Sequence, residues 1–235
     1  MPAALLNNVA HADLRIITRR AAHLGDAVMS ALAFPQEFRS LQAHYPIVFQ
    51  KTADGTSFQP LALLGLQQGQ NLFLGEAGWD APCLPMAIEH QPFMIGLSGD
   101  ELVVHVDLDS PRVSHSEGEA VFLPLGGHTD YLEHINSLLL AIHEGVQETP
   151  AFIAALLQHD LLESFVLDIA LDDGSQSRLA GFYTVHEDRL AALGGAALAQ
   201  LQQAGHLLPI YMALASLSQL RGLIDRQNRR TALPR

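Results

Sequence analysis

The chain has 235 residues, of which 49% are hydrophobic and 16% are charged, and its formal net charge is −12. This length permits one large domain or two small ones, and the low charged fraction indicates a large buried core or a surface kept for a partner. The acidic balance argues against general binding to nucleic acid and against anionic membrane surfaces, because both need clustered cations.

The single cysteine, Cys83, excludes a disulfide within the chain, which is typical of a reducing compartment. Residues 1–11 do not combine a basic start with an apolar run, so we predict no secretory signal and expect a cytoplasmic location. The longest apolar segment, residues 207–220, contains Pro209 and several polar side chains. This composition favours a core helix over a membrane span.

The first half of the chain is predicted to be rich in strands. Its short apolar segments are each closed by Gly, Pro, Asn or Asp, as successive buried strands are. Pro35 is expected to open a short helix that ends near residue 43. The expected strands cover residues 47–50, 58–66, 72–74, 93–97, 102–107 and 120–122, and residues 84–88 can form a strand or a short helix. Together they predict an antiparallel β meander over residues 45–123, as a bent or barrel-like sheet.

The spacing of apolar residues becomes helical after residue 129. A helix is predicted over residues 129–144, capped by Thr129 or the next residue and ended by Gly145. A second helix is predicted over residues 149–158, with Pro150 at its first position. Strands followed by helices indicate an α+β fold.

The last third is predicted to contain a β-hairpin near residues 165–185 and a long C-terminal helix over residues 208–228. Apolar residues occupy nearly every face of that helix, so it is either central in the core or covered by a second copy in a homodimer; we favour the core. Four arginines near its end are interpreted as a solvated helix terminus that matches the helix dipole. We expect one domain over residues 1–235, β-rich at 45–123 and helix-rich at 129–228.

Several segments combine into a family-like pattern. They are Tyr45-Pro46-Ile47-Val48-Phe49, Leu63-Leu64-Gly65-Leu66, Gly69-Gln70-Asn71-Leu72-Phe73, Trp79, Pro92-Phe93 and Leu208-Pro209-Ile210-Tyr211. In this order and spacing the chain resembles the bacterial SapC family from about residue 11 to residue 226, although the family more often has an aromatic or apolar residue at the position of Cys83. The family name implies association with a surface layer. Family members are often encoded beside halogenase-like proteins and outer-membrane receptors, which implies an accessory role with such partners.

A metal site is the main enzymatic alternative. His105 and Asp107 would share one face of a strand, as two ligands of an iron site with two histidines and one carboxylate. A distal histidine such as His143, His159 or His186 would complete a mononuclear oxygenase centre. We favour the interpretation that these histidines are surface residues without a metal. Neither a nucleophile elbow nor a phosphate-binding loop occurs in the sequence.

A binding role is the favoured hypothesis. Trp79 lies on a Gly-rich turn and is a candidate recognition platform, although a Trp that covers the core is the preferred reading. Tyr45, Asn71 and Tyr211, which lie in the family-like segments, are the other candidate ligand-binding residues. We therefore predict a non-enzymatic binding or accessory protein without a cofactor, whose client is a peptide, a carbohydrate-related ligand or a protein. A structural surface-layer component is the third alternative.

Overall fold

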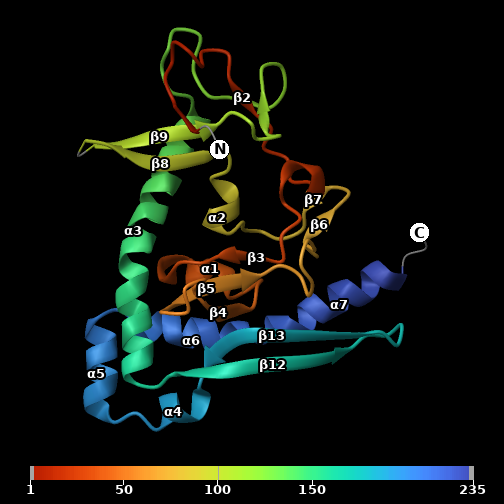
Figure 1. The fold of residues 1–235 in the computed structure, drawn as a ribbon, viewed down its shortest axis with the longest axis vertical. Coiled ribbons are helices and arrows are strands. Elements are labelled where there is room, and N and C mark those ends of the chain that lie inside the picture. Colours follow the sequence, from red (N-terminus) through yellow and green to blue (C-terminus); the bar gives the residue numbers. More distant parts are fainter. Residues whose placement is uncertain (1–2, 100, 233–235) are drawn as a thin grey trace. The chain divides into compact units, whose positions relative to one another are not determined.

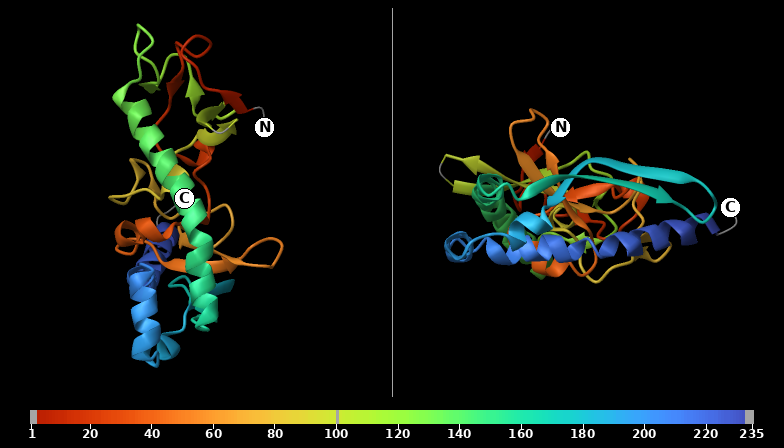
Figure 2. Two further views of the ribbon diagram at one scale, coloured as in Figure 1. Left: turned by 90° about the vertical axis from the view of Figure 1, so that its left-hand side faces the viewer. Right: turned by 90° about the horizontal axis from the view of Figure 1, so that it is seen from below.

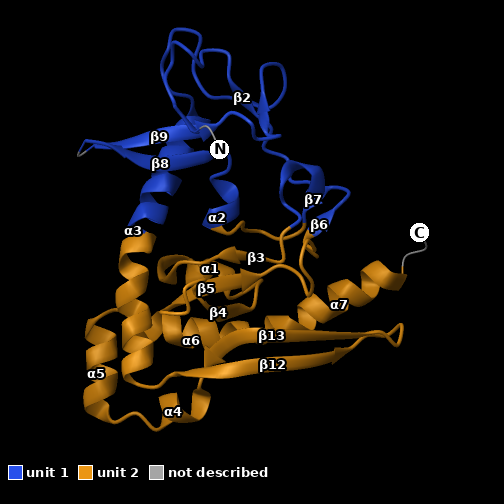
Figure 3. Cartoon of the chain, in the orientation of Figure 1, with its two compact units in different colours: residues 1–27, 74–79, 86–144 blue, residues 28–73, 80–85, 145–235 orange. Residues whose placement is uncertain are grey.

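The computed structural model describes residues 3–99 and 101–232, and the expected 1–235 domain extends past both ends of this part. Its architecture is α+β, as predicted, with several antiparallel sheets and with helices that include a long C-terminal pair (Figure 1). The chain forms two compact units (Figure 3). Unit 1 comprises residues 1–27, 74–79 and 86–144, and unit 2 comprises residues 28–73, 80–85 and 145–235. This division does not coincide with the predicted β-rich and helix-rich segments.

Unit 1 is built on a three-stranded antiparallel sheet in the order β1-β9-β8. These strands are β1 (Ala3–Leu5), β8 (Phe93–Ser98) and β9 (Glu101–Asp107). The other elements are β2 (Arg15–Ile16), η1 (Ala22–Leu24), β6 (Leu74–Gly75), β7 (Gly78–Trp79), α2 (Met86–Glu89), β10 (Val113–Ser114) and β11 (Glu119–Ala120). Residues 84–88, for which strand and helix were both open, therefore contribute to a helix.

The core of unit 1 joins this sheet to the first half of α3 (Asp130–Gln158). Phe93 and Val106, which face each other across β8 and β9, are fully buried. Leu132, Ile135 and Leu139 recur at helical spacing and pack into the same cluster. The apolar residues whose helical spacing predicts this helix therefore form the face that it buries.

Unit 2 is built on a five-stranded antiparallel sheet in the order β12-β13-β4-β5-β3. Its strands are β3 (Ser30–Leu32), β4 (Ile47–Lys51), β5 (Phe58–Leu63), β12 (Leu162–Ala170) and β13 (Gln176–Val185). The predicted hairpin near residues 165–185 is confirmed as β12 and β13. The predicted meander is not one sheet. β4 pairs with β13 and brings β5 into the sheet of this hairpin, whereas β9 pairs with β1 and with β8 in a separate sheet. Pairings so distant in sequence leave no signal in local apolar spacing.

The helices of unit 2 pack around this sheet and include the second half of α3. They are η2 (Pro35–Glu37), α1 (Phe38–Leu41), α4 (Glu187–Ala191), α5 (Gly195–Gln203), α6 (Leu207–Ser216) and α7 (Gln219–Ala232). Pro35 opens the first of them, as predicted, because proline fits the first turn of a helix.

The prediction of two helices over residues 129–158 is wrong, because α3 runs through both breakers. Gly145 is buried, and a Cβ built on it would lie 2.8 Å from the ring of Phe34. The glycine therefore permits close packing instead of ending the helix. Pro150 lacks an N–H group, and the hydroxyl of Thr149 donates to the carbonyl of Gly145.

The predicted long C-terminal helix is present as α6 and α7, but it is not central in the core, because many of its side chains are exposed. The segment divides into α6 and α7 at residues 217–218, and the two follow one another along the sheet of unit 2 (Figure 2). Ile210 and Ala213 are buried, whereas Leu208 and Tyr211 are 50% and 48% exposed. By length and composition Leu207–Ala232 could cross a membrane, a criterion that core helices of soluble proteins also meet.

Candidate ligand-binding site

Two of the four predicted ligand-binding residues are buried supports in unit 2. Tyr45 is fully buried, and its hydroxyl donates to the carbonyl of Cys83 over 2.5 Å. Asn71 is 2% exposed, and its Oδ1 accepts the N–H of Phe73 over 2.9 Å. The ring of Tyr45 meets that of Phe73 edge-on at 4.7 Å. Both residues therefore fix Phe73, and neither lines a cavity described below.

The other two predicted residues are more accessible. Tyr211 lies on the exposed face of α6. Trp79 is half-buried in β7 of unit 1, where it pairs with Leu74 in a two-stranded hairpin. The structure thus brings Tyr45 and Asn71 together around Phe73, and it does not join Tyr211 to them.

His105 and Asp107 each contact a nearby residue of unit 1. The ring of His105 lies over Gly96, where a built Cβ would meet it at 2.8 Å. The carboxylate of Asp107 accepts the N–H of Asp109 in the turn that follows β9. Among the described residues, no group of three or more His, Cys, Asp or Glu side chains is arranged to hold a metal ion.

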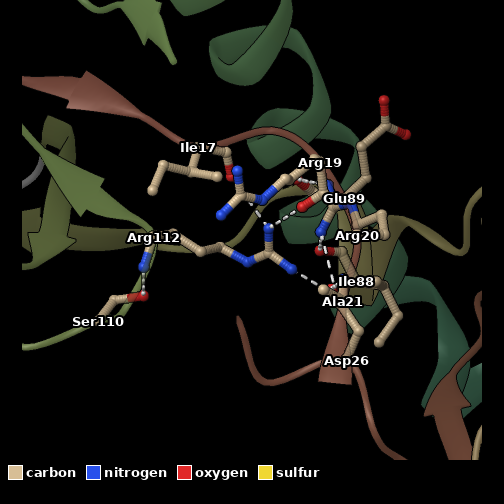
Figure 4. Close-up of polar contacts among 9 residues, drawn as sticks. All are labelled: Ile17, Arg19, Arg20, Ala21, Asp26, Ile88, Glu89, Ser110 and Arg112. Atoms are coloured by element: carbon tan, nitrogen blue, oxygen red, sulfur yellow. Dashed lines mark hydrogen bonds and ion pairs between the residues drawn. The ribbon is translucent and has the colours of Figure 1, made fainter. Parts of the chain in front are cut away.

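A buried ion cluster in unit 1 was not anticipated from the sequence. Asp26 and Arg112 are 0% and 1% exposed, and the guanidinium of Arg112 donates to the carboxylate over 2.5 Å (Figure 4). Arg112 also donates to the carbonyls of Ile17 and Arg19, and Arg20 lies 3.5 Å from the same carboxylate. Burial and the charge of Arg112 lower the pKa of Arg20. These bonds tie residues 17–26 to the unit, which is a structural role.

The best candidate binding site is a cavity of about 500 Å³ in unit 2, which we call the α6 pocket. It lies between α3, the segment of η2 and α1, and the turn from α5 to α6. Its lining residues are Pro35, Gln36, Arg39, Glu148, Ala151, Phe152, Ala204, Gly205, His206, Leu208, Pro209 and Met212. A cavity of this size with mainly apolar walls and a few polar groups is the usual form of a small-molecule site.

Phe152 forms a rigid part of this wall. It is 1% exposed, and its ring packs edge-on against Phe38 at 5.9 Å and against His206 at 5.7 Å. The ring of Phe49 also packs against that of Phe152, with their centres 6.4 Å apart. Rings held by several aromatic neighbours keep one orientation, so this wall is formed before a ligand enters.

His206 gives the pocket a polar group whose charge is suppressed. Burial lowers the pKa of its imidazole, and the carboxylate of Glu148 acts weakly in the opposite direction. The neutral ring offers one donor and one acceptor to a ligand. Arg39 and Glu148, both exposed, supply charges of opposite sign at the pocket.

Sequence reasoning missed every residue of the α6 pocket except the helix that carries Leu208, Pro209 and Met212. One local signal was present, since Gly205 has a φ of +74° and turns the chain between two helices directly before His206. Ala151 and Phe152 lie within the predicted helix over residues 149–158, but their place at a cavity depends on neighbours that are distant in sequence, such as Phe38 and His206.

Comparison with known proteins identifies one family. The family model described as SapC matches residues 6–223. No match was found among curated proteins or among solved structures. Because the model covers most of the chain, the resemblance seen in Tyr45–Phe49 and in Leu208–Tyr211 is confirmed, and the protein belongs to the SapC family.

Proposed function

We propose that this protein is a non-enzymatic binding protein whose α6 pocket holds a small, largely apolar ligand with a polar end. The observation that carries the proposal is the cavity itself, with its volume of about 500 Å³ and its wall around the buried Phe152. Apolar area removed from water contributes about 25 cal/mol per Å², so an apolar body seated against this wall supplies most of the affinity.

The polar groups of the pocket support the second part of the proposal. Neutral His206 presents a donor and an acceptor beside the apolar wall, and the guanidinium of Arg39 attracts a negative or strongly polar end. A few such groups orient a ligand, while the apolar surface holds it. The ligand is therefore amphiphilic.

An accessory role follows from the same site. A protein that holds an amphiphilic ligand can deliver it to another protein, and halogenase-like proteins or outer-membrane receptors are the partners that we propose. Co-purification of tagged protein with each class, with and without a ligand in the pocket, tests this part separately.

The binding part is tested with the fluorescent probe 1-anilinonaphthalene-8-sulfonate, which has an apolar body and an anionic end. Ala151 lies on α3 at the pocket, whereas Ala154 lies one turn further along the same helix and outside it; both are exposed. We expect Ala151→Phe to weaken probe binding by at least about tenfold, or 1.4 kcal/mol, and Ala154→Phe to leave it unchanged. Decanoate is expected to displace the probe from the wild type.

Equal effects of the two substitutions would place the probe elsewhere and overturn the assignment of the pocket. Circular dichroism on both variants shows whether they are folded. Ala204→Phe, which enters the pocket from the end of α5, provides an independent check and should match Ala151→Phe.

A further inference from the structure

A second cavity lies against α7 in unit 2 and differs chemically from the α6 pocket. This α7 pocket has a volume of about 360 Å³ and shares no lining residue with the α6 pocket. One wall is a face of α7 that carries Gln219, Gly222 and Arg229 at helical spacing. His44, Phe73 and residues 80–82 also line the pocket.

Arg226 is held in one geometry within this wall. Its guanidinium stacks 4.3 Å from the centre of the Phe73 ring and donates to the carboxylate and the carbonyl of Asp80. The N–H of Asp80 in turn donates to the carbonyl of Phe73 over 2.7 Å. The three residues form a closed set of contacts, so the polar wall is organised in the absence of a ligand.

Gly222 leaves open space at the wall of the α7 pocket. It lies inside α7, where glycine lowers helix stability relative to alanine. A Cβ built on it would have no heavy atom within 4 Å, so neither close packing nor strain accounts for this glycine. The residue borders the cavity, and a larger side chain there would project into open space that the cavity occupies.

The charges of the lining balance. Arg226 and Arg229 are opposed by Asp80 and Asp225, and Gln219 and His44 add groups that both donate and accept. An anion would meet two carboxylates and a cation would meet two guanidinium groups. The matching ligand carries no net charge and offers many donors and acceptors, together with an apolar face for Ala81 and Pro82.

We infer that the α7 pocket binds a neutral saccharide unit. Sugar hydroxyl groups donate and accept together, which suits paired carboxylate and guanidinium groups, and the C–H face of a sugar ring packs on the exposed ring of Pro82. This function is separate from amphiphile binding in the α6 pocket, so either can fail alone.

In the experiment, the full chain is titrated with glucose, galactose, mannose, N-acetylglucosamine and their short oligomers. Binding is measured by two-dimensional NMR and by calorimetry. We expect at least one neutral saccharide to bind and to shift resonances of Gly222 and its neighbours. Gly222→Leu fills the cavity and should weaken binding at least about tenfold. Arg221→Leu, at the adjacent position outside the lining, is the matched control and should bind as the wild type does.

Three results overturn the inference. The first is no binding by any neutral saccharide of the set to wild-type protein that is folded by circular dichroism. The second is tighter binding of glucuronate, glucosamine or a free amino acid, which would assign a charged ligand. The third is saccharide binding that Gly222→Leu leaves unchanged, which would place the site elsewhere. Ala151→Phe should not alter saccharide binding, and this separates the two pockets.

Discussion

Asp26 neutralises buried positive charge in unit 1. Its carboxylate accepts from Arg112 and from the N–H of Ala21, and Arg20 lies beside it. Taking one partner from a buried ion pair leaves the other charge uncompensated, which is far more costly than losing an exposed pair.

We therefore expect Asp26→Asn to lower the free energy of unfolding by about 3–5 kcal/mol, measured by urea denaturation. Asp168→Asn is the matched control, since Asp168 pairs with Arg178 at the surface. It should change the free energy by less than about 1 kcal/mol. Similar small losses in both variants would show that solvent reaches the Asp26 cluster.

His90 makes stability in unit 1 depend on pH. Burial lowers the pKa of its imidazole, and its Nδ1 lies 2.6 Å from the carbonyl of Phe93. An unfolded histidine titrates at about 6.5, so below that pH the unfolded chain binds a proton that the folded chain resists. The contribution to stability is present above pH 6.5 and is lost as the pH falls through the lowered pKa.

We expect the free energy of unfolding of the wild type to fall between about pH 8 and about pH 5. His90→Gln keeps a donor for the carbonyl of Phe93 and removes the titrating ring, so its decline should be less steep. Parallel declines in the two proteins would contradict this assignment, and an NMR titration of the His90 ring measures its pKa directly.

At the scale of elements, the two glycines inside long helices have opposite roles. Gly145 in α3 is in contact with Phe34 and Gln36, whereas Gly222 in α7 faces open space. Glycine loses about 0.5–1 kcal/mol of helix stability relative to alanine at either position. Whether a Gly→Ala substitution recovers this helix stability depends on the space around the new Cβ.

We expect Gly222→Ala to raise the free energy of unfolding by about 0.5–1 kcal/mol. Gly145→Ala should lower it by about 1–3 kcal/mol, because the buried ring of Phe34 must move. Thermal and urea denaturation of the two variants checks the sign. A stabilised Gly145→Ala protein would mean that Phe34 repacks at little cost.

The elements also show where sequence reasoning succeeds. The β12–β13 hairpin turns at Asp172-Asp173-Gly174, a strong local turn signal. The start of α3 is predicted from Thr129, whose hydroxyl accepts the N–H of Leu132. These signals act over a few residues. Gly145 and Pro150 were read as breakers because the contacts that keep α3 continuous come from residues far away in the chain, such as Phe34.

At the scale of the whole molecule, the charge balance affects stability. The chain carries 25 acidic residues against 13 lysines and arginines. Such an excess repels itself in the compact state, and salt screens that repulsion over a Debye length of about 10 Å at 0.1 M. We expect the unfolding temperature at neutral pH to rise between low and moderate salt.

Thermal denaturation across a sodium chloride series measures this effect. The same series at the pH where the net charge vanishes is the control, and the salt dependence should be much smaller there. A falling unfolding temperature at neutral pH would mean that attractive pairs such as Arg226 with Asp80 outweigh the net repulsion.

Local turns and most of the short helices and strands can be predicted from the sequence, because each depends on neighbouring residues, and the order of these elements indicates the α+β class. The family follows from the order of several motifs along most of the chain. Tertiary structure alone decided that the strands divide between two units, that α3 is continuous, and that Arg226 turns back to Asp80 and Phe73 instead of extending into solvent. It also decided that Tyr45 and Asn71 are supports while Phe152 and His206 line a cavity. Cavities form where side chains from distant segments fail to fill space, and no local pattern of residues encodes that volume.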